Sequence, residues 1–384
     1  MTEPSRISRK SQDIPSFIVM DILEKAGAME ADGKKVIHFE IGEPDFDTPE
    51  PVKKAGIAAI RKGYTKYTHS LGLLELRRAI ADNFNDEYGV EIDPERILVT
   101  SGSSNALFLA LAALIDKGSE VIMSDPGYSC YPHFVSFLGG KPVMVKVDEK
   151  EGFQLRPEMI KKKITKRTCA ILINSPANPT GMTLDSSVMK TIAKLGPVVV
   201  SDEIYHGLIY EGGVNSILEF TGRAFVINGF SKRYAMTGWR LGYMIAPEKY
   251  IRPVQKMQQN FNISANSFVQ WAGISALAHG GPFLKKIRKT FDKRRKFLVN
   301  GLEEIGLPVT HPPKGAYYVF TNASKYGKDS LKLVHKILDE SLVAITPGID
   351  FGEGGEGYLR FSYANSIENM ETGLNRLGKL LGKM

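Results

Sequence analysis

Short, continuously apolar runs alternate with longer amphipathic stretches between about residues 50 and 250. In residues 105–116 the apolar side chains recur at helical spacing, which predicts a helix there. The apolar runs predict short buried strands over 96–102, 120–128, 142–147, 169–176, 197–205, 224–230 and 241–247. Such strands alternating with helices predict an α/β fold, with a mostly parallel sheet covered by helices on both faces.

Several of the predicted strands end in polar residues. These residues are Ser101, Asp125, Asn174, Asp202 and Ser231. In an open α/β sheet, ligands bind outside the carboxyl ends of the strands. The pattern therefore predicts that these side chains converge on one binding site.

The pattern changes near residue 250, where the regular alternation of strands and helices stops. A long, highly charged helix is predicted at roughly 281–306. Shorter helical and strand-like segments follow at 315–322, 330–341 and 357–365. A chain of 384 residues is also too long for one core of ordinary size. We therefore expect two domains: a large domain over 48–285, and a smaller α+β domain built from 1–47 and 286–384.

The composition is that of an ordinary globular protein, with 43% hydrophobic and 24% charged residues. No apolar run approaches the roughly 18–20 residues of a membrane span. The chain starts with basic residues, but no uninterrupted apolar segment follows them, which argues against a secretory signal. We therefore expect a cytoplasmic protein that does not contact a membrane.

The formal net charge of +8 suggests anionic partners. The basic residues, however, lie in amphipathic stretches such as 159–167 and 283–298, which are most simply solvated helix faces. Since the chain has no nucleic-acid motif, we expect no nucleic-acid partner. Cys130, expected in a loop, and Cys169, expected in a strand, are too few for a disulfide framework or a Cys-rich zinc site. We expect no metal.

Residues 352–357, GEGGEG, match the letters of the dinucleotide fingerprint G-x-G-x-x-G. That fingerprint binds pyrophosphate only between a strand and a helix. Here the letters precede a strand-like run and include two glutamates that would repel phosphate. The segment is therefore interpreted as a surface turn.

A better phosphate candidate is SGSSNA, residues 101–106. Gly102 permits a tight turn, and Ser103 and Ser104 stand where the next helix begins. Free backbone N–H groups, hydroxyls and the helix dipole suit a phosphate dianion there. Serine and asparagine are also ordinary helix caps, so this segment alone leaves both interpretations open.

Two further segments carry candidate polar chemistry. Asp202 closes a run of valines, and Tyr205 lies three residues further on. A carboxylate at a buried strand end needs a cationic partner or several hydrogen-bond donors. The partner of Asp202 could be a protonated ring nitrogen of a ligand, or a basic side chain in a structural ion pair. Asn178 lies in a loop with two prolines and a glycine, where its amide could point into a site.

Lys232 follows another apolar run, so it is expected at the same sheet edge as Asp202. Ser231 could donate a hydroxyl to an anion, and Arg240 could make a bidentate contact with it. A lysine held among cations and donors has a lowered pKa, which suits Schiff-base chemistry.

Segments between residues 41 and 364 resemble, in order and spacing, those of class I aminotransferases, which are fold type I pyridoxal-phosphate enzymes. The segments are IGEPDFDTP, YTKYTHSLGLLELR, VTSGSSNALF, DPGYSCY, NSPANPTG, SDEIY, GFSKRYAMTGWRLGY and YLRFSYA. The resemblance implies a seven-stranded type of sheet in the large domain. It also implies a homodimer with its active site at the subunit interface.

The resemblance assigns roles around the ring of pyridoxal 5'-phosphate. Lys232 matches the lysine that forms the Schiff base, and Asp202 matches the carboxylate that keeps the pyridine nitrogen protonated. Tyr205 and Asn178 match the pair that hydrogen-bonds the ring O3′, and Tyr128 matches the aromatic residue stacked on the ring. These matches imply that Lys232, Asp202 and Tyr205 carry the catalysis.

The resemblance also assigns the residues that bind the phosphate of the cofactor. The matching residues are Ser103, Ser104, Ser231 and Arg240, with Tyr67 reaching the phosphate of the partner subunit. Many relatives also have a serine three residues before the lysine, where this chain has Gly229. The resemblance therefore implies one hydroxyl fewer on the phosphate.

The substrate side is assigned to three residues. Arg360 matches the arginine that clamps the α-carboxylate in a bidentate fork, and Gly42 supplies a backbone contact. Asn178 is assigned to the substrate as well as to the cofactor. No second arginine for a distal carboxylate is identifiable in the sequence.

These assignments predict an aminotransferase that moves the α-amino group of an L-amino acid to a 2-oxo acid. Aspartate and 2-oxoglutarate are the first choice, and alanine and aromatic amino acids are alternatives. A β-lyase would share Lys232, Asp202 and Arg360, so the motifs alone do not separate it. A regulatory module would need an attached DNA-binding domain, and only about forty residues precede the matched region.

Overall fold

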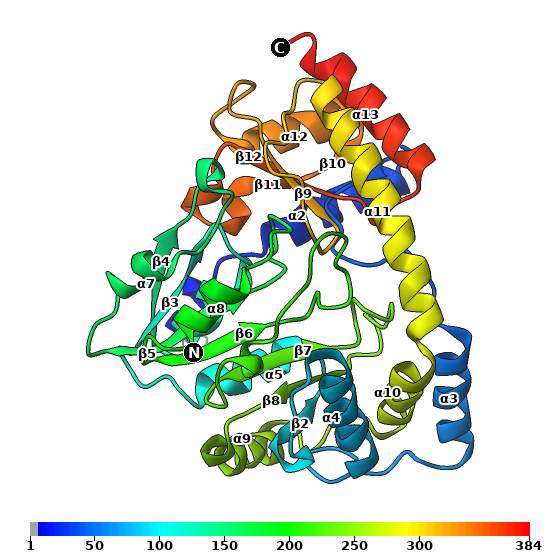
Figure 1. The fold of residues 1–384 in the computed structure, drawn as a ribbon. Coiled ribbons are helices and arrows are strands. Elements are labelled where there is room, and N and C mark those ends of the chain that lie inside the picture. Colours follow the sequence, from blue (N-terminus) through cyan, green and yellow to red (C-terminus); the bar gives the residue numbers. More distant parts are fainter. Residues whose placement is uncertain (1–6) are drawn as a thin grey trace, which may run out of the picture.

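The computed structural model describes residues 7–384. Its central element is a seven-stranded sheet with the order β2-β8-β7-β6-β5-β3-β4 (Figure 1). The strands are β2 Ile97–Thr100, β3 Glu120–Asp125, β4 Lys141–Lys146, β5 Thr168–Asn174, β6 Val198–Asp202, β7 Phe225–Gly229 and β8 Gly242–Ile245. Neighbouring strands are parallel except at β8, which is antiparallel to both β2 and β7. The predicted α/β fold with a mostly parallel sheet is confirmed.

Helices cover both faces of this sheet. Successive residues of a strand point to opposite faces, so each strand contributes side chains to the cores on both sides. In β2, Leu98 joins a core with α5 and α6, whereas Val99 joins a core with α4 and α10. The helices of this part are α3 Glu50–Arg61, α4 Leu74–Tyr88, α5 Ser103–Ala112, α6 Cys130–Phe137, α7 Pro157–Lys161, α8 Ser186–Ile192, α9 Glu248–Phe261 and α10 Ser267–His279. Buried positions on both faces explain the continuous apolar runs in the central strands, whereas the edge strand β4 begins and ends with exposed lysines.

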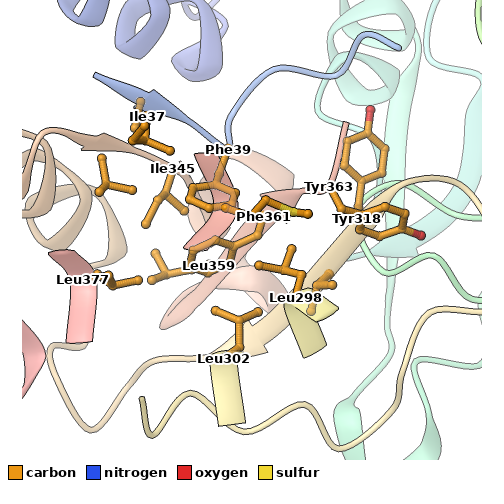
Figure 2. Packing of buried hydrophobic residues seen from close by; sticks show 14 of the residues in the cluster. Ile37, Phe39, Leu298, Leu302, Tyr318, Ile345, Leu359, Phe361, Tyr363 and Leu377 are labelled. Carbon is orange, nitrogen blue, oxygen red and sulfur yellow. The ribbon is translucent and has the colours of Figure 1, made fainter. Parts of the chain in front are cut away.

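A second group of elements surrounds a three-stranded antiparallel sheet of order β11-β12-β9. Its elements are α11 Gly281–Glu304, β9 Tyr318–Asn322, α12 Ser330–Ser341, β10 Val343–Ala344, β11 Thr346–Pro347, β12 Tyr358–Ser362 and α13 Ile367–Leu381. Figure 2 shows its packing, in which the rings of Phe39 and Phe361 meet edge to face at 5.5 Å. Leu298, Leu302 and Leu377 contribute to the same cluster.

The N-terminal elements pack into this second group. They are α1 Arg9–Asp13, α2 Ile18–Ala31 and β1 Ile37–His38. β1 pairs in parallel with β10, and Ile22 and Ala26 of α2 belong to the core around Phe361. The domain boundaries stay predictions, and α11 runs without a break through the boundary expected after residue 285.

Some local expectations need correction. Cys130 begins α6 instead of lying in a loop, whereas Cys169 lies in β5 as expected. Asp125 turns away from the predicted site, because its Oδ1 accepts a hydrogen bond from the Gly354 N–H at 2.8 Å. Residues 352–357 do form a turn before β12, but Gly355 inside it is buried. Among the described helices, none is both long and apolar enough to cross a membrane.

Candidate active site

The carboxyl ends of the central strands open into a pocket of about 360 Å³. Most of the predicted site residues line it: Gly42, Ser103, Ser104, Tyr128, Asn178, Asp202, Tyr205, Ser231, Lys232, Arg240 and Arg360. Asn174 also lines the pocket, but Ser101 and Asp125 do not, so the predicted convergence of strand ends is only partly right. Tyr67 lies outside the pocket with 79% of its surface exposed.

Lys232 lies in the turn that follows β7, and its Nζ donates a hydrogen bond to the Gly42 carbonyl at 2.7 Å. Its pKa is lowered to about 8, mainly by burial. The charges of Arg240 and Arg360 also lower the pKa, whereas those of Glu43 and Asp202 raise it. A Cβ at Gly42 would lie 2.6 Å from the Tyr318 hydroxyl. Glycine at position 42 therefore allows the backbone to lie against the Tyr318 hydroxyl while its carbonyl accepts the hydrogen bond from Lys232.

Asp202 ends β6, and its carboxylate is held by two donors. The Tyr131 hydroxyl donates to Oδ2 at 2.7 Å, and the Ile204 N–H donates to Oδ1 at 3.1 Å. Burial raises the pKa of Asp202 to about 6 in spite of these bonds. Among the described residues no basic side chain forms an ion pair with this carboxylate. A buried carboxylate in this position suits a protonated ring nitrogen.

The start of α5 provides an anion site. Gly102, at φ 92°, turns the chain so that the helix begins at Ser103. A Cβ at Gly102 would lie 2.6 Å from Arg240 Nη2, so glycine allows the guanidinium to approach the helix end. The helix N-terminus, the hydroxyls of Ser104 and Ser231, and the guanidinium form a donor set that fits a phosphate dianion.

Gly229, at the end of β7, is constrained by packing. A Cβ there would lie 3.0 Å from the Leu241 carbonyl and 3.2 Å from the Gly242 Cα. The close approach of β8 thus leaves little room for a side chain at Gly229.

Arg360 lies on β12 and is only 3% exposed. Its Nη1 donates to Asn178 Oδ1 at 3.0 Å, and its Nη2 donates to the Glu40 carbonyl at 2.6 Å and to Thr346 Oγ1 at 3.0 Å. The guanidinium lies over the Tyr318 ring at 4.3 Å. Its Nε is buried without a hydrogen-bond partner. An oriented guanidinium with a free donor is suited to bind a carboxylate.

Tyr205 and Asn178 lie at the same wall of the pocket. The Tyr205 hydroxyl is 3.0 Å from the Tyr318 hydroxyl. The Asn178 N–H donates to Asn174 Oδ1 at 2.8 Å, and Asn174 Nδ2 donates to the Asp202 carbonyl at 2.9 Å. Asn174 therefore ties the loop of Asn178 to the strand end that carries Asp202.

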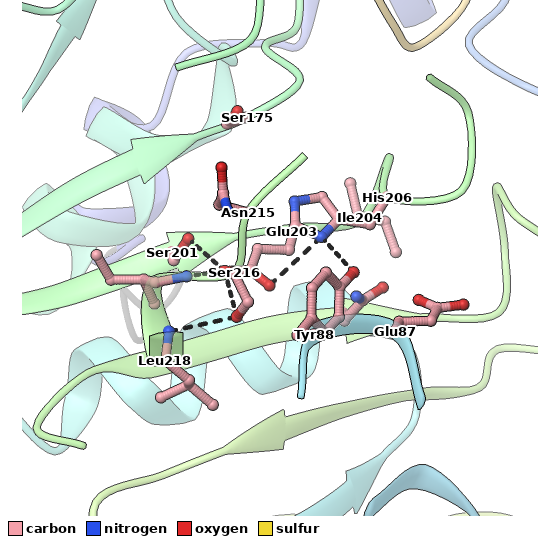
Figure 3. A network of polar contacts seen from close by, with 12 residues as sticks. Glu87, Tyr88, Ser175, Ser201, Glu203, Ile204, His206, Asn215, Ser216 and Leu218 are labelled. Atoms are coloured by element: carbon pink, nitrogen blue, oxygen red, sulfur yellow. Dashed lines mark hydrogen bonds and ion pairs between the residues drawn. The ribbon is translucent and has the colours of Figure 1, made fainter. Parts of the chain in front are cut away.

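A buried polar network fixes the turn that contains Asp202 and Tyr205 (Figure 3). Glu203 Oε1 accepts hydrogen bonds from the hydroxyls of Ser201 at 2.9 Å and Ser216 at 3.1 Å. His206 Nδ1 lies 2.7 Å from the Tyr88 hydroxyl. Burial raises the pKa of Glu203 and lowers that of His206. Burial therefore favours the neutral form of both side chains.

Tyr131, Tyr318 and the first turn of α2 also line the pocket, although no sequence motif assigned them a role. Tyr131 lies in the first turn of α6, and its ring meets that of Tyr128 edge to face at 5.1 Å. Tyr318 and α2 come from distant parts of the chain, and no local pattern marks them.

Comparison with known proteins agrees with this geometry. Residues 34–377 match the family described as aminotransferase class I and II. A (5-formylfuran-3-yl)methyl phosphate transaminase of Methanocaldococcus jannaschii is 43% identical over 98% of this chain and 100% of its own length. An aspartate aminotransferase of Pyrococcus horikoshii is 38% identical over 94% of each chain.

The solved structure of the aspartate aminotransferase from Thermus thermophilus with maleate has a TM-score of 0.95 to this one. The two chains are 36% identical, and the match covers 98% of this chain and 100% of the other. The family match covers most of the chain, and the pocket holds the lysine, carboxylate and anion-binding groups that such an enzyme requires. The chain therefore belongs to the class I and II aminotransferases, which depend on pyridoxal phosphate.

Proposed function

We propose that this aminotransferase transfers the α-amino group of L-aspartate to 2-oxoglutarate. The observation that carries the reaction is the half-buried Lys232 amine, with its pKa lowered to about 8, in one pocket with Asp202, Arg240 and Arg360. The choice of substrates is supported by relatives named aspartate aminotransferases, at 38% and 36% identity.

Bound pyridoxal phosphate supplies an electron-withdrawing ring that makes the Cα proton of the amino acid acidic. In the proposal, Asp202 holds a proton on the ring nitrogen, and Tyr131 keeps the Asp202 carboxylate ionised and oriented. Tyr205 and Asn178 would hydrogen-bond the ring oxygen, and Tyr128 would stack on the ring. All three line the same pocket as Lys232.

The two arginines anchor the two anionic groups. Arg240 binds the cofactor phosphate together with Ser103, Ser104 and Ser231. Arg360 binds the α-carboxylate of the substrate. With both anions held, the Lys232 amine would be placed to act as the general base toward the Cα proton of the substrate. Asn178 and the Gly42 backbone complete the substrate contacts.

The proposal includes a homodimer in which Tyr67 binds the phosphate in the partner subunit. Tyr67, Phe261 and Ile263 expose 79%, 63% and 46% of their surfaces. Their segments are adjacent, since the Thr68 N–H donates to Ser264 Oγ at 3.3 Å. Exposed apolar side chains on neighbouring segments are typical of a protein interface. This patch supports assembly at the side of the molecule that carries Tyr67.

A second candidate is an enzyme for apolar or aromatic amino acids, alanine included. One wall of the pocket is apolar and comes from α2 and the residue before it. Its members are Phe17, Val19, Met20 and Leu23. The basic residues that line the pocket within residues 7–384 are Lys232, Arg240 and Arg360. With two of these assigned to the phosphate and the α-carboxylate, this wall favours a substrate with an apolar side chain.

The test mixes the purified holoenzyme with single amino acids, without an acceptor, and follows the cofactor absorbance together with the 2-oxo acid released. Conversion fastest with aspartate and glutamate supports the proposed substrates. Conversion fastest with alanine or phenylalanine selects the second candidate. Release of pyruvate and ammonia from a β-substituted amino acid, with recovery of the original spectrum, would make the protein a β-lyase instead.

The acceptor is tested in the reverse half-reaction. 2-Oxoglutarate is the first compound, and a furan aldehyde that carries a phosphate is the second, because of the 43% identity to the (5-formylfuran-3-yl)methyl phosphate transaminase. The Lys232→Ala variant serves as the control in both directions. It should bind the cofactor through its phosphate contacts and show no transamination, and full-speed turnover by this variant would contradict the proposed base.

A further inference from the structure

The start of α2 lies at the active pocket. Phe17, the residue before the helix, and Met20 and Leu23 within it all line the cavity. Phe17 provides no side-chain hydrogen bond to the free N–H groups of the first turn. The free N–H at the start of α2 therefore needs an acceptor group from elsewhere in the chain.

That group is Asp350, which lies 332 residues further along the chain. Its Oδ1 accepts a hydrogen bond from the Ile18 N–H at 3.1 Å, and its Oδ2 accepts one from Ser129 Oγ at 2.9 Å. Asp350 is 9% exposed. A carboxylate at the first residue of a helix satisfies a free donor and interacts favourably with the helix dipole.

The segment that carries Asp350 is itself fixed to the edge of the large sheet. The Gly127 N–H donates to the Phe351 carbonyl at 3.0 Å, and the Gly354 N–H donates to Asp125 Oδ1 at 2.8 Å. A Cβ at Gly354 would lie 2.7 Å from the Asp125 carbonyl oxygen, so the two segments are in close contact. Asp350 is therefore held in place independently of α2.

Packing around this contact is incomplete. A cavity of about 200 Å³ is lined by Pro15, Ser16 and Ile18 on one side and by Met144 and Asp350 on others. Apolar packing also holds this part of the chain, through Ile22 and Ala26 of α2 in the second core and through the Phe17 ring against Tyr128, with ring centroids 6.3 Å apart. The carboxylate adds a directional contact at the first turn of α2.

We propose that Asp350 is a positioning residue that fixes the first turn of α2 as a wall of the active pocket and so sets the affinity for the substrate side chain. The proposal depends on the proposed function, because that function makes the pocket the place where substrate binds. Asp350 does not touch the reacting atoms, so its effect falls on substrate binding and leaves the chemical step unchanged.

The kinetic test uses the holoenzyme and its best amino-acid substrate. We expect Asp350→Ala to raise KM about tenfold, because the loss of one charge-assisted hydrogen bond corresponds to a factor of about this size. The value of kcat should stay within about twofold. Asp350→Asn keeps an acceptor oxygen for the Ile18 N–H and should restore most of the affinity. Asp339→Ala is the matched control, because Asp339 pairs with Lys25 of the same helix, at 2.7 Å, but does not line the pocket.

A second variant removes the same bond from the donor side. Ile18→Pro has no N–H, and proline is tolerated at the first position of a helix. We expect it to raise KM as Asp350→Ala does, whereas Ile18→Ala, which keeps the N–H, should not. An unchanged KM in Ile18→Pro and Asp350→Ala would overturn the proposal.

Hydrogen exchange gives a readout that does not depend on activity. Peptides that cover residues 14–20 should exchange faster in Asp350→Ala than in the original protein, and at the original rate in Asp339→Ala. If the holoenzyme converted no amino acid, the proposed function would fail. Faster exchange of residues 14–20 in Asp350→Ala would still support the contact between Asp350 and α2. Unchanged exchange in Asp350→Ala would overturn the positioning role whatever the substrate.

Discussion

Replacing Arg360 by lysine tests how the substrate carboxylate is held. Arginine is oriented by three hydrogen bonds, to Asn178, the Glu40 carbonyl and Thr346, and its buried Nε has no partner in the protein. Lysine keeps the positive charge but has no planar fork. Each charge-assisted bond to the carboxylate contributes about 1.5–3 kcal/mol, and lysine retains one of two. We therefore expect Arg360→Lys to lose about 1.5–3 kcal/mol of transition-state binding, or roughly 10- to 150-fold in kcat/KM.

The assay measures kcat/KM for the best α-amino acid and, as the control, for an amine of similar shape without a carboxylate. The amine should be converted equally by both proteins, since it cannot use the fork. Cofactor content and the melting temperature show whether Arg360→Lys is folded and loaded. A loss below threefold for the amino acid, or an equal loss for both substrates, would refute the assignment of Arg360 to the carboxylate.

Two further predictions concern stability and pH. Phe361→Ala removes a fully buried ring that packs on Phe39. It should lower the free energy of unfolding, measured in a urea titration, by about 3–5 kcal/mol. The control Ile60→Ala, at a half-exposed position, should lower it by about 1 kcal/mol or less. Because the pKa of Lys232 is lowered to about 8, the neutral amine forms as pH rises through that value. Capture of pyridoxal phosphate by the apoprotein should therefore accelerate with a midpoint near pH 8 in stopped-flow absorbance, and a midpoint near the ordinary pKa of lysine, about 10.4, would contradict the burial of Lys232.

Local patterns in the sequence predicted the sheet and the candidate catalytic groups that belong to it. Asp202 ends one apolar strand and Lys232 follows another, and strand ends meet at one edge of a parallel sheet. The same reasoning failed for Asp125, which also ends a strand. Its carboxylate is taken by the Gly354 N–H, 229 residues away, and no pattern around residue 125 carries that information.

The residues that hold the candidate catalytic groups and the walls of the pocket in place were less predictable than the groups themselves. Tyr131 donates to Asp202 across 71 residues, and Asp350 accepts from the Ile18 N–H across 332. Hydrogen bonds of this kind depend on how whole elements pack, and a single sequence shows only the donor and acceptor types. Family resemblance supplied the roles expected of Arg360 and Tyr67, but it could not show that Arg360 is oriented by the Glu40 carbonyl.

The charges in the pocket connect cofactor and substrate binding to the strength of the base. Arg240 and Arg360 both lower the pKa of Lys232, in addition to the larger effect of burial. A bound phosphate offsets the charge of Arg240, and a bound carboxylate offsets that of Arg360. Filling both anion sites should therefore raise the basicity of the Lys232 amine, so that it becomes the stronger proton acceptor when a substrate Cα–H is present. Labelling Lys232 in the apoprotein at several pH values, with and without inorganic phosphate, measures this effect, and a midpoint that phosphate does not raise would refute it.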